Sequence, residues 1–364
     1  MEIRIIKDGE EEKCNNFHNR LYKTNRTLKQ WQWVFLKNDY EPDKPLYTVA
    51  VDNDNIVGTQ TFIPIKMIDE KGIFWTAKSE GTLVDPAFRG KQIFKKMYDL
   101  FFEYAEENRF AYIWGFTTAT KALIRINFKT PLRTTQIFLP FSARAVSMLG
   151  NPESNSLKTN IYKIGLGLAR IFSSIKIIIN KPNLNDSIQI KTVDKAPLEV
   201  GDICKRFIET YGGKTIYRDA EYFQWRIFEN PYAKGIFKTI SVDGKLVGWV
   251  IYSLGDDGVG CLVDILVVPD KNNKYSIEYL LKRLIYEAVI GTRDMGATGI
   301  RGWHVTNHPF DLLIKKVAQS MGFIHFNKGY ASVIYSTQSA TERPSHDLFQ
   351  DWYISRIYTE GVLG

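Results

Sequence analysis

One turn of the chain combines residue types that can hold an anion. Arg89, Gly90 and Lys91 follow an apolar strand pattern and precede an amphipathic helix pattern. The N–H groups in the first turn of a helix have no intrahelical partner, and the aligned peptide dipoles place partial positive charge there. A phosphate fits such a place, because glycine lets the backbone approach the ligand while two cations flank it. The residues alone leave an ordinary solvated basic loop as the alternative.

Three titratable residues elsewhere have types suited to proton transfer. Glu80 lies on the strand that leads into this turn, while His304 and His308 lie in a loop of the second half of the chain. A carboxylate can act as a general base, and histidine titrates near neutral pH. The alternatives are a salt-bridged strand residue for Glu80 and a structural or surface histidine for the other two. No histidine–acid–histidine spacing is present, so we expect no metal site.

The elements that must position these residues follow from the pattern of apolar side chains. In the first half we expect strands at 2–6, 46–51, 56–63, 73–85, 111–115 and 133–140, and helices at 10–23, 90–108 and 119–127. In the second half we expect strands at 188–193, 236–242, 245–254, 259–268 and 299–305, helices at 198–211, 276–294 and 310–320, and further strands to about 336. These patterns predict an α/β fold with mixed sheets.

A largely apolar segment, 157–179, separates the two halves. Lys163, Arg170 and Lys176 interrupt it, and its uninterrupted apolar length falls short of the roughly 20 residues that a membrane span needs. We interpret it as a packing helix between domains, with a helix on the membrane surface as the alternative. The predicted organisation is a domain at 1–145, a helical linker at 146–186, a second domain at 187–340 and a tail at 341–364.

Composition and charge narrow the class of protein. A chain of 364 residues exceeds the roughly 250–300 residues at which single cores stop growing, so we expect two domains. A hydrophobic content of 44% and a charged content of 24% are typical of a folded soluble protein. The net charge of +8 favours an anionic partner, which can be a nucleotide, CoA, nucleic acid or an anionic membrane surface.

The cysteines and the N-terminus bear on the compartment. Cys14, Cys204 and Cys261 have no paired spacing, which argues against a disulfide framework or a zinc site and for a reducing compartment. The first residues alternate like a strand and lack the apolar run of a secretory signal. We therefore expect a cytoplasmic protein.

The two halves repeat an ordered series of motifs. Gln32-Trp33 recurs as Gln224-Trp225, 192 positions later, and Asn38 and Tyr40 recur at the same separation. The repeat predicts two domains of the same fold. The turns differ, however: the second copy has Asp270-Lys-Asn-Asn-Lys274 and no glycine where the first has Arg89-Gly-Lys-Gln. One active copy and one supporting copy is the simplest interpretation.

The order of elements and motifs resembles the GNAT superfamily of CoA-dependent N-acyltransferases, as two tandem modules. The stretch 84–94 is similar to the family's pyrophosphate-binding motif, Arg/Gln-x-x-Gly-x-Gly/Ala. Arg89, Gly90 and Lys91 agree with that motif, whereas Gln92 and Phe94 replace its usual small residues. In the second module, 303–307 and Gly322-Phe323 resemble the later Asn…helix…Gly-Phe motif.

The resemblance implies an acyl-CoA co-substrate held by the first module. It implies a mixed sheet that splays open near Val84, with pantetheine in the gap and hydrogen-bonded to the backbone of Leu83 and Val84. Thr117 and Thr118 stand where the family contacts CoA, although turn capping is their alternative role. The implied cofactor-binding set is Leu83, Val84, Arg89, Gly90, Lys91, Gln92, Ile93, Phe94, Thr117 and Thr118.

Acyl transfer from a thioester to an amine needs a neutral amine, stabilisation of the oxyanion and a proton for the departing thiolate. Glu80 is the candidate base. His304 is a second catalytic candidate, with His308 and Trp303 as acceptor-binding candidates, on the condition that their loop faces the first module's cleft. The position of the family's general-acid tyrosine holds Leu123 in one module and Ala318 in the other, so the proton donor stays unassigned.

The function expected from the resemblance is transfer of an acyl group from acyl-CoA to a primary amine, with a nucleotide-linked amino sugar as acceptor. The chain looks similar to two-module acyltransferases of surface-polysaccharide sugars, such as the D-anthrose pathway enzyme. An aminoacyl-tRNA-dependent transferase like the FemABX enzymes, or a non-catalytic CoA-binding module, are the alternatives. We expect no DNA partner, no transmembrane segment, and at most a weak membrane-surface contact through 157–179.

Overall fold

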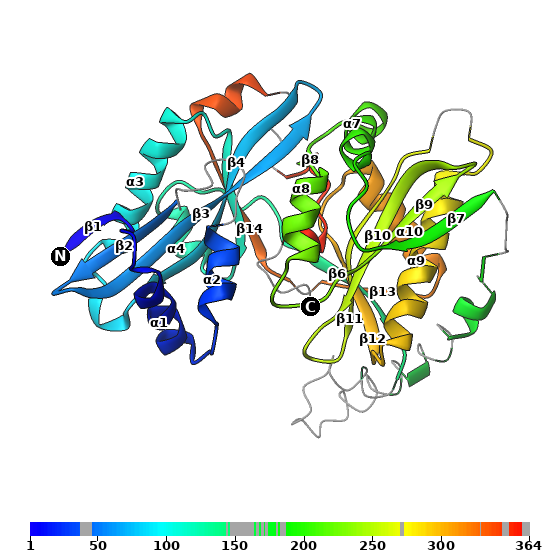
Figure 1. The fold of residues 1–364 in the computed structure, drawn as a ribbon, viewed down its shortest axis with the longest axis horizontal. Helices are drawn as coiled ribbons and strands as arrows, with labels where there is room; N and C mark the ends of the chain where they lie inside the picture. The colour runs from blue at the N-terminus through cyan, green and yellow to red at the C-terminus, as the bar shows by residue number, and fades with distance from the viewer. Residues whose placement is uncertain are drawn as a thin grey trace. The chain divides into compact units, whose positions relative to one another are not determined.

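The computed structural model describes residues 1–36, 46–142, 187–269, 273–327, 329–343 and 349–358, with 145, 164, 167–168, 171, 174–179 and 181–182. The chain divides into two compact units (Figure 1). Unit 1 comprises Met1–Leu132, Lys214–Tyr217 and Tyr330–Leu348, and unit 2 comprises the remaining segments, Arg133–Gly213, Arg218–Gly329 and Phe349–Gly364. In the described part of the chain, each unit contains one seven-stranded mixed sheet.

The sheet of unit 1 has the order β1-β2-β3-β4-β5-β14, with β8 beside β3. Its neighbouring strands are antiparallel except for the parallel pair β4 and β5. The turn between β2 and β3 places Asn53 and Asp54 at positive φ, a conformation that these residue types tolerate. The strands are β1 (Glu2–Ile5), β2 (Tyr47–Asp52), β3 (Asn55–Asp69), β4 (Gly72–Val84), β5 (Tyr112–Thr117), β8 (Thr215–Ile216) and β14 (Ala331–Ser336).

The helices of unit 1 pack apolar faces on this sheet. In α3 the apolar residues recur at three- and four-residue intervals, and Met97, Phe101 and Ala105 among them are buried. Helix α2 begins with a capping box in which Thr27 and Gln30 satisfy each other's backbone N–H groups. The helices are α1 (Glu11–Tyr22), α2 (Leu28–Phe35), α3 (Ile93–Glu107) and α4 (Thr120–Ile124), with 3-10 turns η1 (Pro86–Phe88) and η3 (Gln338–Glu342).

The sheet of unit 2 has the order β13-β6-β12-β11-β10-β9-β7, and its single parallel pair is β11 and β12. Apart from β13, this order repeats that of unit 1, as the duplicated motifs predict. Its strands are β6 (Thr135–Pro140), β7 (Ile188–Val193), β9 (Ile236–Val242), β10 (Lys245–Leu254), β11 (Gly260–Val267), β12 (Gly299–His304) and β13 (Ile324–Phe326). Its helices are α7 (Val200–Tyr211), α8 (Ala220–Phe223), α9 (Ile277–Asp294) and α10 (Pro309–Ser320), with a π-helical turn η2 (Gln224–Phe228) and a 3-10 turn η4 (Arg356–Tyr358).

Each half of the chain supplies one strand to the other unit's sheet. Strand β6 follows α4 along the chain but pairs with β12 and β13 in unit 2, while β14 pairs with β5 in unit 1. In Figure 1 the orange β14 lies among the blue and cyan strands, and the teal β6 lies among the yellow ones. The predicted contiguous ranges 1–145 and 187–340 differ from the two units at these strands. Alternating apolar residues indicate a strand, but they do not specify which of two similar sheet edges it joins.

The predicted α/β class with mixed sheets is confirmed. Most of the predicted linker 146–186 lies outside the described residues, although 174–179 are helical. Within the segments that the structure describes, no helix is both long enough and apolar enough to cross a membrane.

Candidate active site

The sheet of unit 1 opens between its two parallel strands. Strands β4 and β5 pair at Ala77 with Ile113 and at Lys78 with Trp114, and in the described residues the pairing goes no further. Beyond this point β4 stays paired with β3 and β5 with β14. At Gly115 a Cβ atom would lie 3.1 Å from the Ser79 carbonyl oxygen, so glycine allows the close approach from which the strands part. The result is the splayed sheet that the resemblance implies, opening from Ser79 towards Val84.

A β-bulge bends β4 beside this gap. Thr61 faces Glu80 and Thr59 faces Leu83, so one residue of β3 lies opposite both Gly81 and Thr82. Gly81 adopts a φ of +61°, which glycine takes without a steric penalty. Such a bulge re-aims the side chains on either side of it and increases the local twist.

The loop after β4 leads into α3 as an exposed turn. Gly90 has a φ of +82° and Gln92 a φ of +59°, so Gln92 takes the left-handed conformation where the family motif has a small residue. The first helical hydrogen bond runs from the Lys96 N–H to the Gln92 carbonyl at 3.0 Å. The N–H groups of residues 93–95 therefore have no acceptor within the helix, and this end of α3 is suited to an anion.

The predicted cofactor-binding residues in this loop contribute in different ways. Arg89 and Lys91 are exposed, and the Lys91 Nζ lies 4.5 Å from the centre of the Phe88 ring. Ile93 is buried in the core, and Phe94 packs against Tyr98 with ring centres 4.8 Å apart. Ile93 and Phe94 therefore offer a ligand their backbone rather than their side chains.

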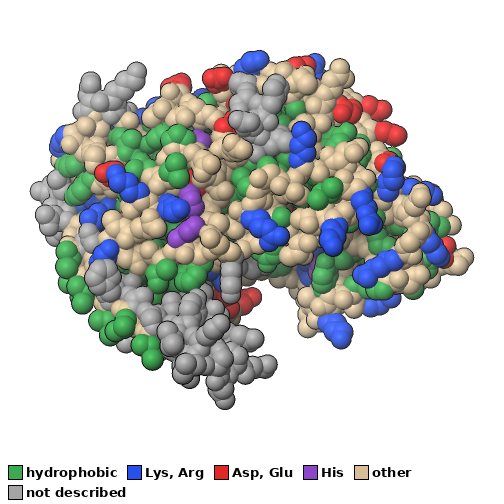
Figure 2. Space-filling model, turned by 180° about the vertical axis from the view of Figure 1, so that it is seen from behind, with side chains coloured by type: hydrophobic (Ala, Val, Ile, Leu, Met, Phe, Trp, Pro, Cys, Tyr) green, Lys and Arg blue, Asp and Glu red, His purple; other side chains and the backbone are tan. Residues whose placement is uncertain are grey.

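Figure 2 shows one face of the molecule, on which Lys and Arg side chains are spread widely while Asp and Glu side chains lie mainly near its upper edge.

Glu80 forms an ion pair with Lys78. The two residues lie two positions apart on β4, and so on the same face of the sheet. Their side chains are 18% and 6% exposed. Glu80 is thus a salt-bridged strand residue, which is the alternative that the sequence leaves open. It can act as a base only if it exchanges this partner.

A cluster of polar side chains lies beside the gap, and the sequence did not predict it. Ser79 Oγ and Tyr98 OH are 2.7 Å apart, and Thr82 Oγ1 lies 3.2 Å from the same phenol oxygen. Gln60 donates from Nε2 to Ser79 Oγ at 3.0 Å and accepts from Thr82 Oγ1 at Oε1. Burial raises the pKa of Tyr98, so its phenol stays protonated. Tyr98 has the spacing of a core residue on α3, and only the bulge brings Ser79 and Thr82 to the same side of β4.

Thr117 ends β5 on the other side of the gap, and Thr118 follows it. Thr117 Oγ1 accepts a hydrogen bond from the Ala119 N–H at 3.0 Å, which is the turn-capping role left open by the sequence. Thr118 is exposed.

His308 lies in unit 2, where it caps α10. Its Nδ1 accepts a hydrogen bond from the Phe310 N–H at 3.2 Å, so the ring proton lies on Nε2, which is 3.3 Å from the Gly212 carbonyl oxygen. The residue is 1% exposed, and its ring stacks on Phe207 with centres 5.5 Å apart. Burial lowers its pKa. These contacts indicate that His308 has a structural role, and they do not favour the predicted role of binding the acceptor.

His304 and Trp303 also belong to unit 2, at the end of β12. His304 Nδ1 lies 3.1 Å from Asp311 Oδ2, a spacing that forms an ion pair when the ring is protonated but lacks hydrogen-bond geometry. Asp311 Oδ2 also accepts the N–H groups of Val305 and Thr306. The structure thus places His304, Trp303 and His308 in one unit and Glu80 with the loop of 89–92 in the other.

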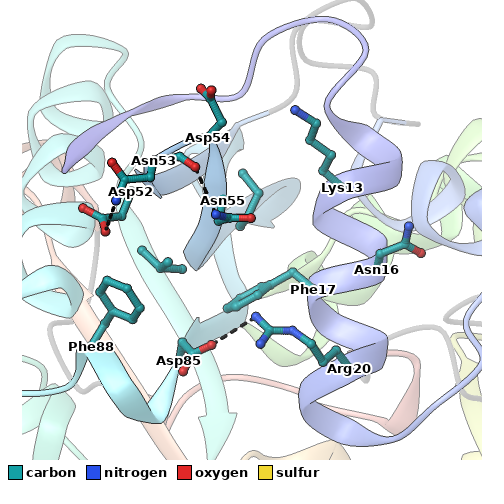
Figure 3. Close-up of a pocket in the computed structure, with 12 residues that line it drawn as sticks. Lys13, Asn16, Phe17, Arg20, Asp52, Asn53, Asp54, Asn55, Asp85 and Phe88 are labelled. Carbon is teal, nitrogen blue, oxygen red and sulfur yellow. Dashed lines mark hydrogen bonds and ion pairs between the residues drawn. The ribbon is translucent and has the colours of Figure 1, made fainter.

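A hollow of about 710 Å³ lies next to the loop that follows β4 in unit 1 (Figure 3). It is lined by α1, by the turn between β2 and β3, and by the start of the loop after β4. Arg20 and Asp85 form an ion pair at 3.0 Å across it, and Lys13 extends from α1 along one side. In the residues that the structure describes, no group of three or more His, Cys, Asp or Glu side chains is arranged to hold a metal ion.

Residues 2–128 match the acetyltransferase (GNAT) domain family. The matched residues contain the splayed strands, the bulge and the loop of 89–92. No curated protein matches the chain.

Solved structures share the fold of most of the chain. A probable N-acyltransferase of unknown function from Enterococcus faecalis V583 aligns with 93% of the chain and 73% of its own, with a TM-score of 0.61 and 7% identity. A GCN5-related N-acetyltransferase from Anabaena variabilis covers 92% and 72%, with a TM-score of 0.59 and 7% identity. Eis1 from Mycobacterium abscessus covers 94% and 75%, with a TM-score of 0.56 and 11% identity. At these identities the similarity shows a shared fold.

Proposed function

We propose that this protein transfers an acyl group from acyl-CoA to a primary amine and that its GNAT domain holds the acyl-CoA. One observation carries the proposal: the gap between β4 and β5 leads directly to a helix N-terminus whose first N–H groups have no helical acceptor. An extended pantetheine chain can hydrogen-bond to the backbone of Leu83 and Val84 as an added strand would. The pyrophosphate then meets the N–H groups of α3 with Arg89 and Lys91 beside it.

The residues around the gap suit the requirements of acyl transfer. Glu80 is the proposed base, because a carboxylate at this place on β4 can accept the proton of the amine. Because Glu80 pairs with Lys78, it takes the amine proton directly after leaving that partner, or through one water. The backbone N–H groups along the splayed β4 are the proposed donors to the oxyanion.

The proposed acceptor is a nucleotide-linked amino sugar. The net charge of +8 favours an anionic substrate, and the hollow in Figure 3 offers Lys13 and Arg20 together with carboxylates that can bind an amine. His304 and Trp303 are proposed to serve the acceptor from unit 2. The three cysteines are buried and unpaired, which supports a cytoplasmic location as part of the same proposal.

Calorimetry with CoA, followed by a thiol-release assay with an acyl-CoA and a panel of amines, tests the proposal. We expect CoA to bind and thiol release to require an amine, with nucleotide-linked amino sugars most active. CoA binding with no amine-dependent release would indicate a binding module instead. A transfer that requires aminoacyl-tRNA and weakens steeply with salt would indicate the FemABX-like alternative. Absence of both CoA binding and thiol release would refute the assignment.

A further inference from the structure

Unit 2 contains a second gap between parallel strands. Strands β11 and β12 pair in parallel at Gly260 with Ile300 and at Cys261 with Arg301, while β11 continues to Val267. A bulge follows here too, since the register of β10 on β11 shifts between Ile251 and Tyr252. The two units therefore share the local geometry that opens the sheet, as expected of duplicated domains.

The gap of unit 2 is closed by the C-terminal segment of the chain. A cavity of only about 10 Å³ remains there, which is about the size of a single water site. Residues from β11, β12 and α10 line it on the side of the sheet, and 353–356 line it on the other. In unit 1 the corresponding strand end is only partly buried, since residues 79–84 of β4 are all of intermediate burial, whereas every residue of β11 is buried.

The C-terminal segment hydrogen-bonds to the strand that borders the gap. Tyr353 OH donates to the backbone carbonyl of Ile265 on β11. Ser355 Oγ donates to Asp264 Oδ1 at 2.6 Å on the same strand. The Arg356 guanidinium lies 5.6 Å from the centre of the Trp303 ring on β12. The segment therefore contacts both strands, and it uses a β11 carbonyl that an extended ligand would need.

Burial of this segment matches that of a domain core. Five of its large side chains are each 1% exposed, and its backbone is held by a hydrogen bond from Arg226 Nε to the Ile357 carbonyl at 3.1 Å. Tyr358 OH also donates back to the Tyr353 carbonyl at 3.0 Å. Such burial favours a fixed part of the fold, because each large apolar side chain removed from water stabilises the folded state. The five are Trp352, Tyr353, Ile354, Ile357 and Tyr358.

We propose that residues 349–358 permanently occupy the strand gap of unit 2. Only the gap of unit 1 is then open to acyl-CoA, so the protein binds one acyl-CoA per chain. The inference rests on the proposed function, which places the acyl-CoA site in the gap of unit 1. The loop that follows β11 agrees with it, because its sequence from Asp270 to Lys274 contains no glycine for a close approach to pyrophosphate. A peptide takes the place of pantetheine in one copy of the fold, while the other copy keeps the gap for the co-substrate.

Hydrogen exchange read by mass spectrometry, combined with calorimetry, tests this on the full-length protein. We expect one CoA per chain, slow amide exchange at 352–358 with and without saturating CoA, and CoA-dependent slowing confined to about 80–96. Two CoA molecules per chain, or faster exchange at 352–358 when CoA is added, would overturn the inference. If the wild-type chain binds no CoA, the proposed function fails, whereas fast exchange at 352–358 without ligand shows that the segment is not resident.

Two conservative variants test the contacts themselves. Tyr353→Phe and Ser355→Ala each remove one hydrogen bond to β11 and keep most of the buried volume. Each is expected to lower the thermal midpoint by about 2–4 °C, as the loss of one such interaction does in a protein domain of 150–250 residues, while CoA stoichiometry and affinity stay unchanged. Unchanged thermal midpoints in both variants would contradict the proposed docking.

Discussion

A single charge placed at Gly90 gives the sharpest test of the proposed pyrophosphate site. Gly90 is exposed, has a φ of +82°, and a Cβ atom added there would meet no other atom within 4 Å. Gly90→Asp therefore clashes with no neighbouring atom and places a carboxylate beside the N-terminus of α3, although any side chain at this positive φ strains the backbone. Gly90→Asn is its matched control, because Asn has nearly the same shape and the same tolerance of left-handed backbone but no charge.

The size of the effect follows from Coulomb's law. Two unit charges 4 Å apart repel by about 1 kcal/mol in bulk water and about 4 kcal/mol near a protein surface. The loop is exposed, so each of the two pyrophosphate charges should add about 1–1.5 kcal/mol of repulsion, close to the value in water. The total of about 2–3 kcal/mol corresponds to roughly 30–150-fold weaker CoA binding by Gly90→Asp than by Gly90→Asn.

Calorimetry at two salt concentrations measures this difference. The ratio between the two variants should shrink at 1 M salt, where the screening length falls from about 10 Å at 0.1 M to about 3 Å. Pantetheine, which lacks the pyrophosphate, should bind both variants equally. Equal CoA affinities for Gly90→Asp and Gly90→Asn at low salt would refute the placement of the pyrophosphate at this loop.

Four further outcomes can be measured. Glu80→Gln should lower the transfer rate about 10²–10⁴-fold with CoA affinity unchanged; an unchanged rate would remove Glu80 as the base. Tyr98→Phe should destabilise the protein by about 0.5–1.5 kcal/mol in denaturant unfolding, because two hydroxyls lose a buried partner; no change would mean that the cluster contributes nothing to stability. Burial lowers the pKa of His308 in the folded protein, so as the pH falls the unfolded chain takes up a proton at this residue before the folded protein does. The contribution of His308 to the free energy of unfolding should therefore be constant above about pH 6.5 and decrease as the pH drops further. His308→Asn, a non-titrating cap, should reduce this slope, and an identical slope would contradict the assignment. A fragment of residues 1–145 should fail to fold, because it lacks β14, whose Val333 and Ile334 are buried; a cooperative thermal transition in that fragment would contradict this.

Much of the local structure follows from the sequence because it depends on near neighbours. The period of apolar residues specifies α3 and α9, and the Asp52–Asn55 turn specifies the hairpin of β2 and β3. The repeat of Gln-Trp motifs predicts two sheets of the same order, which the structure shows. Arg89-Gly90-Lys91 after a strand and before a helix is enough to indicate an anion-binding turn, because the dipole and unpaired N–H groups belong to the helix itself.

Features that depend on distant parts of the chain were decided by the tertiary structure. The bulge at Gly81 and Thr82 unites Ser79 and Thr82 with Tyr98, and neither spacing nor residue type signals this cluster. His308 has the residue type of an acid–base group, yet its contacts with Phe310 and the Gly212 carbonyl make it a helix cap.

The sequence by itself determined the elements and their duplication and predicted a candidate anion-binding turn, since these arise from periodicity and backbone chemistry within a few residues. Only the tertiary structure decided that β6 joins the sheet of unit 2, that β14 joins the sheet of unit 1, and that 349–358 fill the gap beside β11. An exposed strand edge or a splayed gap accepts any segment that supplies hydrogen bonds and apolar surface. Which segment reaches it depends on the path of the folded chain, and no local pattern records that path.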